Sequence, residues 1–117
     1  MIFVIDDDIM MAECIKKACG ESEVLIFGDA ISAMNKISDG IVPKLIFLDI
    51  LLDGPDGFTF INEMVSYSDT ASIPIVVVSS LDFAKKNLSS YGVVGALSKD
   101  NMTPEEILAY AKQYDQE

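Results

Sequence analysis

Carboxylates, a hydroxyl and a lysine stand at the ends of several apolar runs in this 117-residue chain, where they could form one chemical site. In chain order, these polar residues are Asp6, Asp7, Asp8, Asp49, Ser79 and Lys99. Clustered carboxylates repel one another unless a cation lies among them, and Mg²⁺ takes carboxylate and phosphate oxygens as ligands. A hydroxyl and a lysine beside such a cluster could bind the oxygens of a phosphoryl group. The pattern therefore indicates Mg²⁺-assisted phosphoryl chemistry.

Each of these residues also has a simpler explanation. The three consecutive aspartates are equally typical of a solvated turn that caps a helix, and for Asp8 capping is the better interpretation. Asp49 could be a turn former, although burial of a carboxylate after four apolar residues is costly without a partner. Ser79 alone is typical of a hydroxyl bonded to the backbone, and Lys99 alone of a solvated charge. The prediction of a site depends on their shared position, because ligands of doubly wound sheets bind just beyond the carboxyl ends of the strands.

Five short apolar runs predict the strands that would position these residues. The runs are residues 2–5, 24–27, 45–48, 75–78 and 93–97. Apolar residues recur at helical spacing in segments 11–18, 30–37, 58–65, 83–88 and 107–114. Thr103, Pro104 and Glu106 predict the start of the last helix, with a capping box. Because parallel strands need crossover helices, this alternation predicts one α/β domain over residues 1–117, with helices on both faces of a parallel sheet.

Composition narrows the classes of partner. Eight basic residues against nineteen acidic ones give a net charge of −11, which repels nucleic-acid backbones and anionic lipids and favours cations or basic protein surfaces. We therefore expect neither direct nucleic-acid binding nor membrane association. No apolar run approaches the ~20 residues of a membrane span, and the first eight residues turn acidic too early for a signal peptide.

The cysteine and histidine content narrows the chemistry. Cys14 and Cys19 match no zinc or thioredoxin spacing, so we expect them to be small packing residues, reduced in a cytoplasmic protein. The chain has no histidine, which excludes a Ser/His/Asp or Cys/His catalytic set and a phosphohistidine on this chain.

Four motifs in this order resemble the receiver domain of two-component response regulators, and the resemblance covers nearly the whole chain. They are FVIDDD at residues 3–8, LDILLDGPDG at 48–57, PIVVVSS at 74–80 and GALSK at 95–99. Each motif alone is weak, but four at this spacing are specific. The resemblance implies a flavodoxin-like (βα)5 fold, a doubly wound parallel sheet of five strands in the order 2-1-3-4-5.

The same resemblance assigns roles to the polar residues. Asp49 would be the phosphoacceptor. Ser79 would turn toward the phosphoryl group once it is bound, and Lys99 would offset the charge of that group. The Mg²⁺ ligands that the resemblance implies are Asp6, Asp7, Asp49 and the backbone carbonyl of Leu51.

A function follows from these roles. Asp49 would take a phosphoryl group from the phosphohistidine of a sensor histidine kinase or a histidine phosphotransfer protein. Phosphorylation would then switch a surface that binds an unknown downstream protein, with the chain a monomer or a phosphorylation-dependent dimer. The chain would be a switch and not a turnover enzyme.

Two departures from the family pattern keep an alternative open. Ala96 stands where the family has a rotating aromatic side chain, and Asp100 stands where a proline commonly follows the lysine. The Lys99–Asp100 peptide is therefore expected to be trans. The alternative function is a receiver-like protein-interaction module that works without phosphorylation.

Overall fold

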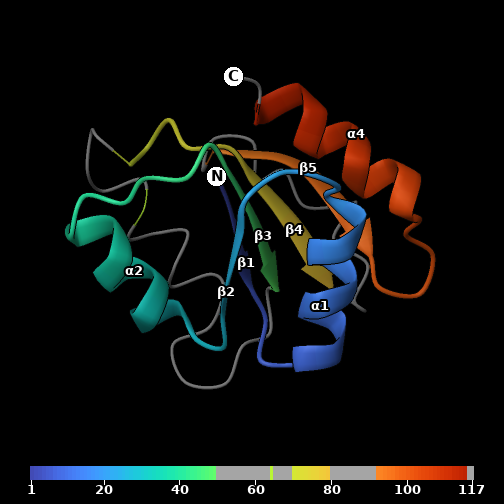
Figure 1. The fold of residues 1–117 in the computed structure, drawn as a ribbon, viewed down its shortest axis with the longest axis horizontal. Coiled ribbons are helices and arrows are strands. Elements are labelled where there is room, and N and C mark those ends of the chain that lie inside the picture. Colours follow the sequence, from blue (N-terminus) through green and yellow to red (C-terminus); the bar gives the residue numbers. More distant parts are fainter. Residues whose placement is uncertain (50–63, 65–69, 80–91, 116–117) are drawn as a thin grey trace.

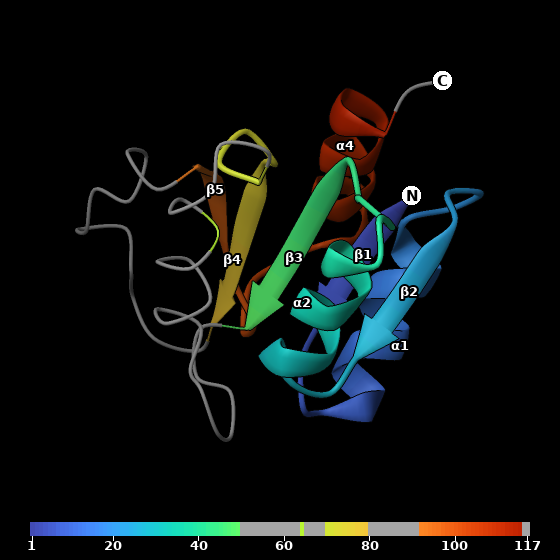
Figure 2. The same ribbon diagram turned by 90° about the vertical axis from the view of Figure 1, so that its left-hand side faces the viewer.

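The computed structural model describes residues 1–49, 64, 70–79 and 92–115, and its strands form one parallel sheet. The strands are β1 (Ile2–Ile5), β2 (Val24–Phe27), β3 (Leu45–Asp49), β4 (Ile75–Ser79) and β5 (Val93–Ser98). They lie side by side in the order β2-β1-β3-β4-β5, and Figure 2 shows the arrowheads of β2, β3 and β4 at one edge. The predicted α/β class, the flavodoxin-like fold and the strand order are confirmed.

Helices cover both faces of this sheet (Figure 1). One face packs against α2 (Ala30–Ser38), and the other against α1 (Ile9–Ala18) and α4 (Pro104–Tyr114). The helical segments predicted at 58–65 and 83–88 lie outside the described residues, apart from Met64, which is buried on the α2 side. None of the helices in the described part of the chain is long and apolar enough to cross a membrane.

The central strand β1 explains how the sheet forms two cores. Side chains alternate along a strand, so Phe3 and Ile5 pack on the α2 side while Ile2 and Val4 pack on the α1 and α4 side. All four are fully buried, because helices cover both faces. This burial fixes the carboxyl end of β1 at the rim, the edge of the sheet where the carboxyl ends of the strands lie.

The helix starts follow the sequence signals. Asp8 is the N-cap of α1 and accepts hydrogen bonds from the Met10 and Met11 backbone N–H groups, as predicted. Thr103 begins α4 with the predicted capping box, in which its hydroxyl accepts from the Glu106 N–H and the Glu106 carboxylate accepts from the Thr103 N–H. No peptide bond among the described residues is cis, so Lys99–Asp100 is trans as predicted.

Two expectations need correction. The strands β3, β4 and β5 each extend one residue beyond the apolar run, because Asp49 pairs with Val78 and Ser79 pairs with Ser98 in the ladder. The prediction that both cysteines are small packing residues is wrong for Cys14: Cys19 is buried, but Cys14 is exposed. Five residues are nearly one and a half helical turns, so the two thiols leave α1 on different sides.

Candidate functional site

Three carboxylates meet at the carboxyl ends of β1 and β3. Asp6 and Asp7 follow β1, and Asp49 is the last residue of β3, the strand that pairs with β1 through Ile5 and Leu48. One carboxylate oxygen from each aspartate lies within 4.8 Å of the other two. Asp6 and Asp49 are buried, while Asp7 is exposed, so the cluster opens to solvent on one side.

Lys99 joins this cluster from the end of β5. Its Nζ lies 3.1 Å from Oδ2 of Asp49 and 3.4 Å from Oδ2 of Asp6. Its backbone N–H donates to the Ser79 carbonyl, so the pairing of β4 with β5 sets where the lysine leaves the sheet. Burial lowers the pKa of Lys99, but the hydrogen bond to Asp49 and the charges of both carboxylates outweigh it, so the pKa is raised and the amine is a cation.

Asp6 carries the feature that points most directly to a ligand. Its side chain is 1 % exposed, and Oδ1 accepts a hydrogen bond from the Asp8 N–H at 2.9 Å. Among the described residues, its buried Oδ2 has the Lys99 ammonium, 3.4 Å away, as an ion-pair partner but accepts no well-formed hydrogen bond. Burial raises the pKa of Asp6, and the charge of Asp49 raises it further, against the lowering effects of the Asp8 N–H and Lys99.

The residues present fit a hard divalent cation such as Mg²⁺. Among the described residues, three carboxylates gather around the Lys99 ammonium, so negative charges outnumber positive ones in this part of the rim. A buried carboxylate oxygen without a hydrogen bond is costly, and a cation among the three aspartates removes that cost. An oxygen-only donor set open to water suits Mg²⁺, which retains several water ligands. Asp6, Asp7 and Asp49 would hold it, whereas the predicted carbonyl ligand Leu51 lies outside the described residues.

Ser79 lies beside this cluster as the last residue of β4. Asp49 pairs with Val78 on the neighbouring strand, so Ser79 is one position further toward the rim. It is 2 % exposed. The structure therefore brings Asp6, Asp7, Asp49, Ser79 and Lys99 to one rim.

One contribution was missed from the sequence, where helix capping was the preferred interpretation of Asp8. Its backbone N–H fixes Oδ1 of Asp6, while its own carboxylate caps α1. An aspartate that accepts from the N–H two residues later forms an Asx turn, and the spacing of Asp6 and Asp8 allows it. This turn connects the orientation of Asp6 with the start of α1.

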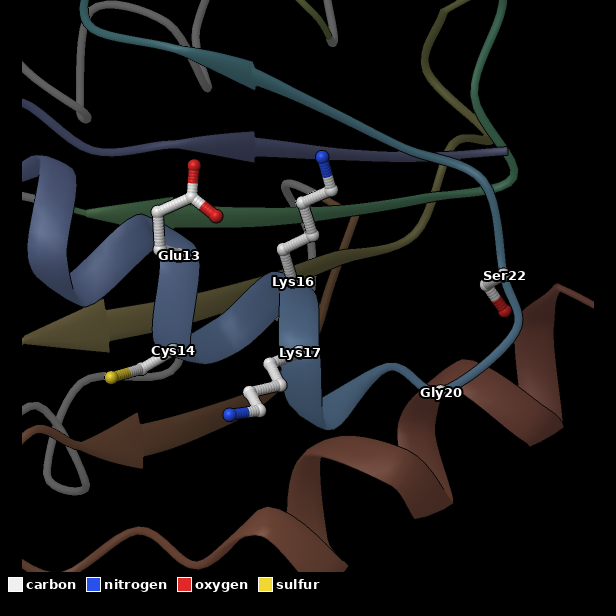
Figure 3. A pocket seen from close by; sticks show the side chains of 6 residues that line it. All are labelled: Glu13, Cys14, Lys16, Lys17, Gly20 and Ser22. Carbon is white, nitrogen blue, oxygen red and sulfur yellow. The ribbon is translucent and has the colours of Figure 1, made fainter.

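A surface hollow of about 480 Å³ lies elsewhere, against the later part of α1 (Figure 3). It is lined by Glu13, Cys14, Lys16, Lys17, Gly20 and Ser22. Figure 3 shows Lys16 and Lys17 leaving the helix in opposite directions, so its charges do not converge on one point. It contains none of the residues at the carboxylate rim.

Comparison with known proteins identifies a family for this chain. Residues 2–112 match the sequence model of the response regulator receiver domain. The receiver domain of NtrX from Brucella abortus superposes with a TM-score of 0.83 at 24% identity, covering 97% of each chain. The phosphorylated cyanobacterial phytochrome response regulator RcpA has a TM-score of 0.75 at 24% identity, over 96% of this chain and 88% of that chain. The Mn²⁺-bound form of the response regulator Rcp1 has a TM-score of 0.74 at 21% identity, with the same two coverages of 96% and 88%. No curated protein sequence matches significantly.

Proposed function

This chain belongs to the response-regulator receiver family, and we propose from that premise that Asp49 accepts a phosphoryl group in a Mg²⁺-dependent reaction. The observation that carries the proposal is the arrangement around Asp49, a 4 % exposed carboxylate held 3.1 Å from the Lys99 ammonium beside two further aspartates. A solved relative in phosphorylated form and another with bound Mn²⁺ support it by analogy.

The donor would be a phosphohistidine on a sensor histidine kinase or a histidine phosphotransfer protein. A carboxylate oxygen of Asp49 attacks the phosphorus in line, the P–N bond to the imidazole breaks, and a P–O bond to Asp49 forms. The product is an acyl phosphate on Asp49 and a free imidazole on the donor. Bound Mg²⁺ would neutralise charge on the phosphoryl oxygens.

The chain's own residues then have separate tasks. Asp6 and Asp7 hold the cation, while Lys99 turns from its ion pair with Asp49 to the transferred oxygens. The hydroxyl of Ser79, one strand away, binds a phosphoryl oxygen in the product. Ser79 ends β4 and Lys99 follows β5, so these new contacts pull on the ends of both strands. Phosphorylation would thereby shift the conformation of the surface around β4 and β5.

We further propose that residues 1–117 act as one receiver domain, a switch in the cytoplasm with no catalytic turnover. The charge of −11 favours donors and downstream proteins with basic surfaces over nucleic acid or membranes. The protein is a monomer, or a dimer once phosphorylated.

A phosphorylation-independent interaction module is the second candidate. The observation in its favour is Ala96 on β5, which is exposed and has no rotamer that could report the state of Ser79.

The deciding experiment is labelling with acetyl phosphate, with and without Mg²⁺, followed by intact mass. We expect one added phosphoryl group, dependent on Mg²⁺ and absent in Asp49→Ala. Asp39→Ala is the matched control, because Asp39 is an exposed aspartate at the end of α2. Unlabelled wild-type protein, or equal labelling of Asp49→Ala, would reject the phosphoacceptor in favour of the interaction module.

A further inference from the structure

β5, the strand directly before Lys99, contains Gly95. Tyr110 from α4 occupies the space that a side chain at this position would need. A Cβ on Gly95 would overlap Oη of Tyr110 and would lie 2.6 Å from its Cζ. No side chain fits there, so the end of the Tyr110 ring lies directly over the backbone of β5. A glycine inside a strand weakens it and often marks such a close approach.

The strand needs this support for two reasons. β5 is at the edge of the described sheet and is paired only with β4. Its register also shifts, because Val93 pairs with Ile75 and Gly95 with Val76, which leaves Val94 as an extra, exposed residue. A bulge next to a glycine leaves an edge strand poorly defined, and an aromatic ring over such a glycine can restore order.

Tyr110 supplies that ring from the face that α4 already covers. It is partly buried against the same core cluster as Leu97 of β5 and Ile107 of α4. Beyond Leu97 the strand ends at Ser98, and the next residue, Lys99, donates its N–H to the Ser79 carbonyl and reaches Asp49 with its side chain. Gly95 is four residues before Lys99, about 13 Å along an extended strand.

We propose that Tyr110 is a positioning residue, which fixes β5 over Gly95 and thereby holds Lys99 against Asp49. The proposal builds on the phosphoacceptor function of Asp49 and adds a residue of α4 to it. Tyr110 touches no reacting atom in this arrangement. Its effect passes through the backbone between Gly95 and Lys99.

The test compares the rate of Mg²⁺-dependent labelling by acetyl phosphate in folded variants. Tyr110→Ala should slow labelling about tenfold, because small misplacements of a charge-stabilising group cost rate steeply. Tyr110→Phe should restore most of the wild-type rate, because Cζ and Cε1 of the ring, 2.6 and 3.0 Å from the Cβ position, remain over Gly95 when the hydroxyl is removed. Tyr114→Ala is the matched control: Tyr114 is a partly buried tyrosine on the same helix, packed against the same cluster, and its loss should leave the rate within twofold.

A double-mutant cycle separates positioning from general damage. In a Lys99→Met background, Tyr110→Ala should cause no further loss, because no lysine remains to be positioned. Equal loss in both backgrounds, or a folded Tyr110→Ala protein that labels at the wild-type rate, would overturn the inference. Circular dichroism and urea unfolding identify variants that do not fold, and Tyr110→Leu then takes the place of Tyr110→Ala.

The NMR signal of the Lys99 ammonium tests the positioning role without any phosphorylation, and therefore separately from the phosphoacceptor function. The ammonium resonance of Lys99 should move toward that of a solvent-exposed lysine in Tyr110→Ala and remain in place in Tyr110→Phe. If wild-type protein is not labelled at all, the phosphoacceptor function fails, and this resonance alone decides whether Tyr110 positions Lys99. An unchanged resonance in Tyr110→Ala would refute the positioning role even where labelling of wild type succeeds.

Discussion

Replacing Lys99 with methionine tests the electrostatics of the rim most directly. Its ammonium lies 3.1 Å from Asp49 and 3.4 Å from Asp6, and its side chain is 19 % exposed. At an effective dielectric constant of about 20, each contact is an attraction of roughly 5 kcal/mol, much of it offset by desolvation of the three groups. Removing one partner of a buried ion pair costs about 3 to 5 kcal/mol, and the partial exposure places Lys99→Met at about 3 kcal/mol in Mg²⁺-free buffer.

Mg²⁺ should reduce that loss, because a divalent cation among the same carboxylates replaces the missing positive charge. We expect urea unfolding in EDTA to show the full destabilisation of Lys99→Met, and unfolding in excess Mg²⁺ to show about 1 kcal/mol or less, the range of weak surface pairs. Lys36→Met is the control, because Lys36 is exposed in the last turn of α2 and should cost only about 0.5 kcal/mol in either buffer. A Lys99→Met protein as stable as wild type in EDTA, or a loss that Mg²⁺ leaves unchanged, would refute this account.

Three further predictions concern the rest of the molecule. The Asp115 carboxylate accepts a hydrogen bond from the N-terminal ammonium of Met1. Burial raises the pKa of Asp115, but this hydrogen bond, a second one from Ser22 and the positive charges of the N-terminus and Lys44 lower the pKa overall. Because the folded pKa lies below the unfolded one, the stabilisation is complete above the ordinary value of 3.8 and is lost as pH falls through the folded pKa. Asp115→Asn should therefore unfold at lower urea than wild type at pH 7, by about 1 kcal/mol, with the difference vanishing in strong acid; a difference that persists in acid would contradict this. Thr103→Ala removes the N-cap of α4 and should cost about 1 kcal/mol in urea unfolding, whereas Thr103→Ser should cost little; equal losses would argue against the cap. A maleimide should label one thiol per native chain, at the exposed Cys14, because burial raises the pKa of Cys19 to about 12; mass analysis of peptides checks this, and native labelling of Cys19 would be inconsistent with its burial.

The strands and the candidate rim could be predicted from sequence because both depend on local signals. Runs such as 2–5 and 45–48 are short, apolar and followed directly by aspartate. The apolar residues predict a buried strand, and the aspartate predicts where that strand reaches the edge of the sheet. The capping box at Thr103 is equally local. Asp49 was still placed just beyond its strand instead of inside it, because its last ladder pair depends on the neighbouring strand β4.

Features that depend on packing between distant segments could not be predicted. The close approach of Tyr110 to Gly95 depends on how α4 crosses the edge strand, and neither residue alone signals it. Similarly, the sequence does not show which of the two cysteines is buried, because that depends on which side of α1 packs against the sheet. The Asx turn from Asp6 to Asp8 is local, yet helix capping by Asp8 explained the same residues and hid it.

The order of the strands also has a consequence for how the protein acquires its site. Lys99 and Asp49 are separated by 50 positions in the sequence, and their contact requires β3, β4 and β5 to be paired in register. Such non-local parallel pairings close long loops and form slowly. The rim is therefore complete only in the fully assembled sheet, and the contact of Lys99 with Asp49 reports the end of folding. The three carboxylates need only β1 and β3 to be paired, so a cation can bind before β5 is in place and would then stabilise a partly assembled sheet.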